Sequence, residues 1–120
     1  RRSIYTFWKR SSPPPAMIIF DAPSRQFCSM QRSISNTPLQ ALVLLNDPQF
    51  IELYDSLASQ FHKSGNPVNG KVQKLYKLLF CRGPSPKELS LCSEYLRANN
   101  NNWFLLIQSL MNTDEFLTIE

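Results

Sequence analysis

Three short signatures, each a polar residue followed by proline, divide the chain and are typical of helix starts. They are Thr37-Pro38-Leu39-Gln40, Asn46-Asp47-Pro48-Gln49 and Ser85-Pro86-Lys87-Glu88. In the first and third, Gln or Glu follows the Thr or Ser cap by three residues and can bond back to the N–H of the cap. Proline suits the first helical position because that N–H has no helical partner. The sequence therefore predicts helices that begin at Pro38 and Pro86, with a break near Asn46.

An apolar stripe with helical spacing follows Pro48. Its members are Phe50, Leu53, Tyr54, Leu57, Ala58 and Phe61. Residues that recur every three or four positions share one face of a helix, and such a face is normally buried in a core. This helix is predicted to end near Lys63, before Gly65.

Three further helical pieces have the same kind of spacing. They carry Val72, Leu75, Tyr76, Leu78 and Leu79; then Leu89, Cys92, Tyr95 and Leu96; and last Trp103, Leu106, Ile107, Leu110 and Met111. Residues 64–70 read as a loop, Gly83-Pro84 as a helix stop and residues 99–102 as a polar turn. The pieces on either side of Gly83-Pro84 are predicted to form an antiparallel hairpin. A short helical turn is expected at residues 113–116.

Residues 1–36 lack a clean helical period. Pro13-Pro14-Pro15 predicts an extended polyproline segment, and residues 21–24 predict a turn. The apolar residues 17–20 are expected to be partly buried. We therefore expect an extended, proline-rich arm packed across the helices.

The predicted fold class is all-α, a compact bundle of about five helices with that N-terminal arm. A chain of 120 residues with 42% hydrophobic residues fits one domain with one core. The arm, residues 1–36, is expected to be an integral part of this domain, and residues 37–120 form its helical part. No apolar run approaches the length of a membrane span.

The net charge of +4 is unevenly distributed. Residues 1–32 hold six basic residues against Asp21 alone, which gives +5, and the other seven basic and eight acidic residues give −1. Such a segment can attract nucleic acid, an anionic surface or an acidic protein. Its arginines can equally bind carbonyl and carboxylate groups of the chain itself.

Cysteine and histidine residues indicate no metal site and no covalent haem. Cys28, Cys81 and Cys92 form neither CxxC nor CxxCH, and their spacings match no common zinc pattern. The one histidine, His62, lies near a predicted helix end, where it can interact with the negative end of the helix dipole. No cofactor is expected in this chain. Because the chain begins with Arg1, we expect it to be cut from a longer protein.

The first half of the chain resembles a planctomycete-type domain of unknown function. The resemblance rests on an ordered series of motifs: residues 2–10 (RSIYTFWKR), Pro14-Pro15, residues 20–25 (FDAPSR), Cys28 and residues 36–48 (NTPLQALVLLNDP). It is looser at residues 82–89 and 110–117. In that family the domain is the C-terminal module of large exported bacterial proteins that often carry cytochrome c-like domains. The resemblance implies a periplasmic or cell-surface location and upstream domains as partners, but it supplies no catalytic residues.

One polar set is the leading candidate site, because the arm can bring its members beside the start of the helix at Pro38. Its members are Arg10, Asp21, Arg25, Arg32, Asn36 and Gln40. Free N–H groups at a helix start favour an anion, so the set predicts a small anion site. The alternative is internal: Asp21 pairs with Arg10 or Arg25, and Asn36, Thr37 and Gln40 cap the helix. Trp8, among aromatic and basic neighbours, can stack on a carbohydrate ring or anchor the arm.

Two functions follow from these features. The favoured one is a helical interaction module that docks against other domains of its own polypeptide, which exposed apolar surface near residues 4–8 would support. The alternative is one wall of an interdomain enzyme site, redox or polysaccharide-related, built from Arg10, Asp21, Arg25 and Arg32. Catalysis by this chain alone is not expected, because its motif-rich region lacks histidine and has one acidic residue. Nucleic-acid binding is disfavoured because the helical part is nearly neutral.

Overall fold

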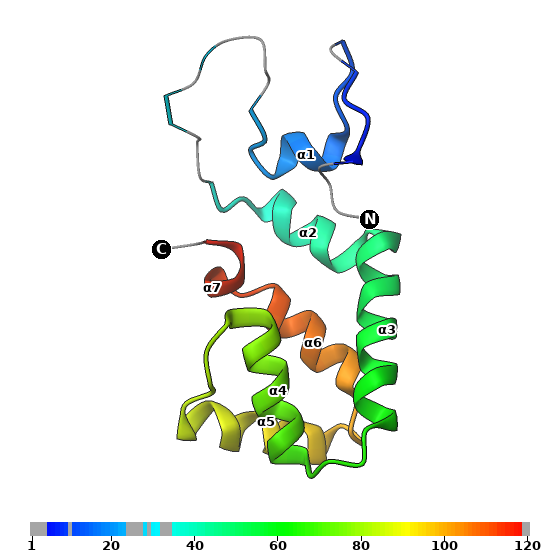
Figure 1. The fold of residues 1–120 in the computed structure, drawn as a ribbon, viewed down its shortest axis with the longest axis vertical. Coiled ribbons are helices and arrows are strands. Elements are labelled where there is room, and N and C mark those ends of the chain that lie inside the picture. The colour runs from blue at the N-terminus through cyan, green and yellow to red at the C-terminus, as the bar shows by residue number, and fades with distance from the viewer. Residues whose placement is uncertain (1–4, 10, 24–27, 29, 32–34, 119–120) are drawn as a thin grey trace. The chain divides into compact units, whose positions relative to one another are not determined.

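A computed structural model describes residues 5–9, 11–23, 28, 30–31 and 35–118. Within these residues the secondary structure is α-helical, with no β-strand, which confirms the predicted all-α class (Figure 1). The helices are α1 (Pro15–Ile19), α2 (Pro38–Asn46), α3 (Pro48–Lys63), α4 (Val68–Phe80), α5 (Pro86–Ala98), α6 (Trp103–Met111) and α7 (Asp114–Leu117). The chain divides into two compact units, residues 1–43 and residues 44–120, which are described separately below.

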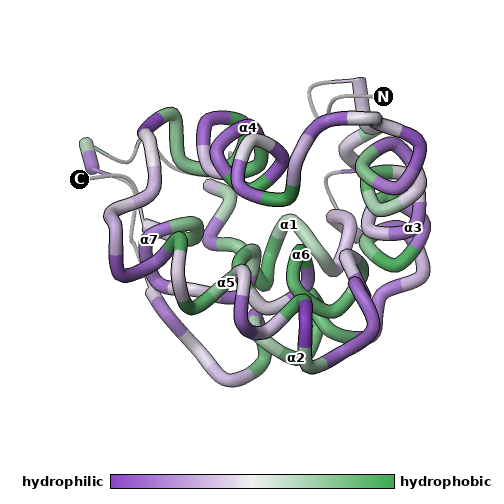
Figure 2. The backbone as a smooth tube through the Cα atoms, turned by 90° about the horizontal axis from the view of Figure 1, so that it is seen from below, coloured by the Kyte–Doolittle hydropathy of each residue, from purple (hydrophilic) through white to green (hydrophobic). Residues whose placement is uncertain are grey.

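The second unit contains the hydrophobic core. Helix α6 packs against α3, α5 and α7, and α4 packs against α5 and α7. The buried core residues are Tyr54, Ala58, Phe61, Val72, Leu75, Tyr76, Cys92, Leu96, Trp103, Leu106, Ile107 and Met111. Apolar and polar positions alternate around α3 and α4 (Figure 2), as expected for helices with one buried face. The amphipathic stripes of the sequence therefore identify most of this core.

Two leucines of the predicted stripes do not enter the core. Leu53 is 42% exposed and Leu78 is 58% exposed. Each lies at the edge of its stripe, because successive helical residues are about 100° apart and the buried faces centre on Tyr54 and Val72. The inward placement of these two side chains was wrong.

Helix starts follow the predicted caps. The Ser85 hydroxyl accepts from the Glu88 N–H (3.3 Å) while the Glu88 carboxylate accepts from the Ser85 N–H (2.6 Å). The Asp47 carboxylate accepts from the Gln49 N–H (2.8 Å). At the start of α6, where the sequence predicted only a polar turn, the Asn102 side chain accepts from the Leu105 N–H (3.3 Å). Helix α4, however, starts earlier than expected, at Val68. Pro67 occupies the N-cap with φ −61° and ψ 153°, so the loop ends there and Gly70 lies inside the first helical turns.

The break between α2 and α3 leaves carbonyl groups that other side chains satisfy. Leu44 cannot receive the ordinary helical bond from four residues on, because that residue is Pro48, which has no N–H. The buried Tyr54 hydroxyl instead donates to the Leu44 carbonyl (2.8 Å). The Gln108 amide donates to the Leu45 carbonyl (3.2 Å), whose helical donor, the Gln49 N–H, is engaged by Asp47. Side chains of α3 and α6 thus cap the end of α2.

The first unit differs from the expected extended arm. Pro14 is extended, with φ −58° and ψ 130°, but residues Pro15–Ile19 form the short helix α1. Proline is compatible with the first helical position, so the extended segment ends where the prolines end. The prediction that residues 17–20 are extended was therefore wrong. Met17, Ile19 and Phe20 are half-buried, as expected, and Ile18 is exposed.

Candidate functional site: the Asp21–Ser35–Gln40 cluster

Gln40 is the buried polar centre of the first unit, with only 3% of its surface exposed. Its side-chain oxygen accepts from the Thr37 N–H (3.2 Å), and its own N–H donates to the Thr37 hydroxyl (3.4 Å). This reciprocal pair confirms the capping box predicted from the sequence. The side-chain Nε2 group of Gln40 donates to the Ile19 carbonyl (2.8 Å), so the start of α2 is tied to the end of α1.

Asp21 occupies an unusual backbone conformation directly after α1. Its φ is +55°, in the left-handed region where glycine is usually found. The Asp21 N–H donates to the Ile18 carbonyl (3.1 Å) and the Ala22 N–H donates to the Met17 carbonyl (2.8 Å). These two bonds form the Schellman motif that ends many helices. A non-glycine residue here carries some strain, which the side chain of Asp21 must offset.

The Asp21 carboxylate gathers donors from the other side of the cluster. Its Oδ2 atom accepts from the Ser35 N–H (2.9 Å), the Ser35 hydroxyl (2.5 Å) and the Gln40 amide (3.4 Å). The Gln40 amide also lies 3.2 Å from the Ser35 hydroxyl. One carboxylate oxygen therefore joins segments that are 14 residues apart in the chain.

The structure brings two of the predicted site residues together. Asp21 and Gln40 are brought within hydrogen-bonding distance, Trp8 is half-buried and Asn36 is exposed. Arg10, Arg25 and Arg32 lie outside the described residues, so their part in an anion site stays a prediction. Ser35 was missed, because a single serine outside any periodic pattern gives no sequence signal for a contact so distant in the chain.

The described contacts of this cluster hold parts of the first unit together. The Asp21 carboxylate lies beside the start of α2 and accepts from the N–H and the hydroxyl of Ser35. Negative charge near a helix start is stabilising, so the arrangement is favourable without a ligand.

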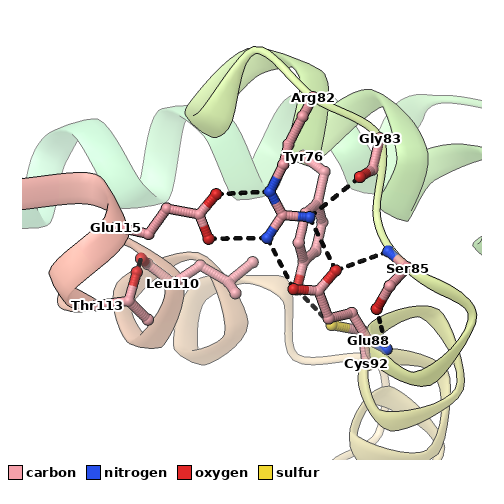
Figure 3. Close-up of polar contacts among 9 residues, drawn as sticks. All are labelled: Tyr76, Arg82, Gly83, Ser85, Glu88, Cys92, Leu110, Thr113 and Glu115. Carbon is pink, nitrogen blue, oxygen red and sulfur yellow. Dashed lines mark hydrogen bonds and ion pairs between the residues drawn. The ribbon is translucent and has the colours of Figure 1, made fainter. Parts of the chain in front are cut away.

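A second polar cluster, in the other unit, centres on Arg82 (Figure 3). Its guanidinium donates to the Glu115 carboxylate through Nε (2.5 Å) and one terminal nitrogen (2.8 Å). It donates to both oxygens of Glu88 (2.8 and 2.9 Å) and to the Gly83 carbonyl (3.1 Å). A guanidinium has five N–H donors, so all of them are used. Its carbon also lies 5.5 Å from the centre of the Tyr76 ring.

The ionisation of this cluster follows from its contacts. Hydrogen bonds from Arg82, and then from the Ser85 backbone, lower the pKa of Glu88 to about 2. Hydrogen bonds from Arg82 also lower the pKa of Glu115, and those to Glu88 and Glu115 raise the pKa of Arg82. The three groups stay charged at neutral pH and tie α7 and the start of α5 to the end of α4.

Tyr76 and Cys92 lie behind this network and are chemically quiet. The Tyr76 hydroxyl is 3.7 Å from the Cys92 sulfur. Burial, followed by the hydrogen bond to Cys92, raises the pKa of Tyr76, and burial raises the pKa of the Cys92 thiol. Both groups are therefore neutral near pH 7, and a neutral thiol is a poor nucleophile.

The described residues form neither a metal-binding cluster nor a membrane-spanning helix. No group of three or more His, Cys, Asp or Glu side chains there could hold a metal ion. No described helix is both long and apolar enough to cross a membrane. A shallow apolar depression of about 410 Å³ is lined by residues of α5 and by Leu106 of α6, with Glu94 as the one charged group of its lining.

Fold and clusters together define an all-α domain whose described polar networks are internally paired. The chain belongs to the PSD1 family, a protein of unknown function (DUF1553), whose family model matches residues 1–96. The expectation of a domain of unknown function is confirmed, and the match extends over the first unit and α3 to most of α5. No curated protein and no solved structure matches the chain.

Proposed function

We propose that this chain is a noncatalytic helical interaction module that docks against other parts of its own polypeptide through residues 5–20. The observation that carries this proposal is the exposure of two aromatic rings at its start. Tyr5 is 76% exposed and Phe7 is 82% exposed. Large aromatic side chains are enriched at the centres of protein interfaces, because each buries a large area with few rotatable bonds.

Several apolar side chains of the first unit are exposed, and none of those described is fully buried. No hydrophobic side chain is buried among the described residues of the range 5–43, where Gln40 is the buried residue. Ile18, Leu39 and Leu42 are each more than half exposed. The unit is ordered by polar contacts at Asp21 and Gln40 instead of a core of its own. Covering Phe7 alone would stabilise a complex by about 2 kcal/mol before the costs of association.

The described polar groups support a binding role over a catalytic one. Those with perturbed pKa values are engaged with one another, as in the Arg82 network, or are buried and neutral, as are Tyr76 and Cys92. A catalytic site needs a nucleophile or base that converges on space for a substrate. The enzyme-wall alternative depends on Arg10, Arg25 and Arg32, and it stays a prediction, as do export, cytochrome association and a carbohydrate ligand.

A photochemical crosslinking experiment tests the docking proposal. In the natural polypeptide that contains this chain, Phe7 is replaced by the photoreactive analogue p-benzoylphenylalanine, which keeps an aromatic ring at the position. Leu91, an exposed apolar residue of α5, carries the same replacement as the matched control. Crosslinked peptides are then identified by mass spectrometry.

The expected result is intramolecular crosslinks from position 7 to residues outside this chain, at several times the yield from position 91. Crosslinks that join two copies of the polypeptide would instead identify self-association and overturn the proposal. Equal yields at positions 7 and 91, or no crosslinks at all, would also overturn it, because a docked ring must have a specific neighbour.

A further inference from the structure

Helix α4 carries an uncompensated positive charge. Residues 56–87 contain no Asp or Glu, whereas they contain Lys63, Lys71, Lys74, Lys77, Arg82 and Lys87. Of these, Arg82 forms ion pairs with Glu88 and Glu115. None of the lysines forms an ion pair with any residue that the structure describes. The acidic residues nearest in sequence, Asp55 and Glu88, lie outside the segment.

Three of these lysines and an exposed leucine lie along the same side of α4. Lys74 and Leu78 are four residues apart, and Lys74 is three residues from both Lys71 and Lys77. Residues three or four positions apart are neighbours on the surface of a helix. Lys74 and Lys77 are exposed, and Leu78 is 58% exposed. Lys71 lies at the flank, where its ammonium group is 5.9 Å from the centre of the buried Trp103 ring. We call Lys71, Lys74, Lys77 and Leu78 the lysine face.

We propose that the lysine face is a second docking surface, which binds an acidic protein segment that presents carboxylates around an apolar side chain. Its elements differ from residues 5–20, so it does not depend on their docking. Leu78 adds an exposed apolar contact beside the charged side chains, and protein interfaces combine apolar contacts with a polar rim. The absence of acidic residues from residues 56–87 makes the face complementary to carboxylates.

The residue types favour a protein over a nucleic acid. The exposed cations of α4 are lysines, which act as point charges, whereas bidentate phosphate recognition favours arginine. The aromatic residues of α4 are Tyr76, which is buried, and Phe80, which is half-buried beneath Arg82. The face therefore offers no exposed ring on which a base can stack. Leu78, by contrast, gains nothing from contact with a phosphate backbone.

The test measures binding of the complete 120-residue chain to a fluorescein-labelled model helix of about 18 residues, built from Leu, Glu and Ala with one apolar face. Lys74→Glu/Lys77→Glu reverses the charge of the face, and Lys74→Gln/Lys77→Gln removes it more mildly if the first variant unfolds. Lys87→Glu/Arg97→Glu on α5 changes the net charge by the same amount and is the matched control. Leu78→Ser removes the exposed apolar side chain of the lysine face. Circular dichroism checks the fold of each variant.

We expect Lys74→Glu/Lys77→Glu to weaken binding by about tenfold or more, while the α5 control changes it by less than about threefold. Leu78→Ser should weaken binding of the model helix by about fivefold and leave binding of polyglutamate unchanged. Equal losses in both charge variants would overturn the proposal, because net charge alone would explain them. No binding of the model helix would overturn it as well. Tighter binding of duplex DNA or dextran sulfate, insensitive to Leu78→Ser, would identify a general polyanion surface instead.

Discussion

Replacing Tyr54 by phenylalanine removes one hydroxyl from the core and leaves its shape unchanged. Tyr54 has no exposed surface, and its hydroxyl donates to the carbonyl of Leu44, which is 2% exposed. Because Pro48 has no N–H to offer that carbonyl, no backbone donor four residues on can take over. The substitution therefore leaves a buried acceptor without its partner and creates no cavity.

The expected loss follows from that orphaned acceptor. Losing a buried hydrogen bond while one partner stays in place costs about 1–3 kcal/mol. In a domain of this size each kcal/mol lowers the melting temperature by about 4 °C, so Tyr54→Phe should melt about 4–12 °C lower. Urea denaturation and calorimetry measure both quantities. Tyr95→Phe is the matched control. Tyr95 is half-buried, and its hydroxyl makes no hydrogen bond to the residues that the structure describes. This substitution should change the free energy of unfolding by less than about 0.5 kcal/mol.

The pH dependence gives the same experiment a second readout. Burial raises the pKa of Tyr54 above its ordinary value of 10.0. A group whose pKa is raised by folding contributes its full stability below the unfolded pKa and loses it as pH rises through the folded pKa. The difference between wild type and Tyr54→Phe should thus be constant up to about pH 10 and shrink above it. If Tyr54→Phe unfolds within about 0.5 kcal/mol of wild type at neutral pH, the account of the α2 end is refuted.

Three further predictions concern the polar clusters and the helix ends. Glu88→Gln should lower the melting temperature at pH 7 but have little effect near pH 2. Folding lowers the pKa of Glu88 from 4.5 to about 2, so the stabilisation from its carboxylate is lost as pH falls through that range. A difference in melting temperature that persists at pH 2 would contradict this. Cys81→Gly should raise the free energy of unfolding, measured by urea denaturation, by about 0.5–1 kcal/mol, since Cys81 has φ +58° at the end of α4, where a Cβ is unfavourable. Cys81→Ala keeps the Cβ and should be neutral, so an equal gain from alanine would rule out the backbone explanation. Asp21→Gly should speed hydrogen exchange at the Ser35 amide, because that N–H loses its acceptor, even though glycine relieves the backbone strain of the positive φ at position 21. An unchanged exchange rate would mean that the carboxylate does not hold the two segments together.

Much of the second unit could be predicted because its signals are local. A capping residue and a proline lie next to the helix that they start, so Pro48 and Pro86 each begin a helix as expected, as does Pro38 in the first unit. Helical spacing likewise reports which face of α3 and α6 is buried. Edge positions such as Leu53 and Leu78 were misjudged, because the width of a buried face depends on which helix covers it.

The first unit was harder to predict because its order depends on contacts between distant residues. The polyproline signal at residues 13–15 correctly indicates an extended Pro14 but cannot reveal that Pro15 is already the first residue of α1. The capping role of Gln40 was visible in the sequence, whereas its bond to the Ile19 carbonyl was not, since 21 residues separate them. Ser35 carried no signal at all.

The sequence by itself determined the helical class, most helix boundaries and the basic character of the first segment, because propensity, capping and charge act over a few residues. Only the tertiary structure decided which polar groups meet. Arg82 donates to two carboxylates that lie 6 and 33 residues away, and Asp21 joins Ser35 across 14 residues. Such pairings are set by how the helices pack, and packing brings together residues whose separation along the chain contains no information about their distance in space.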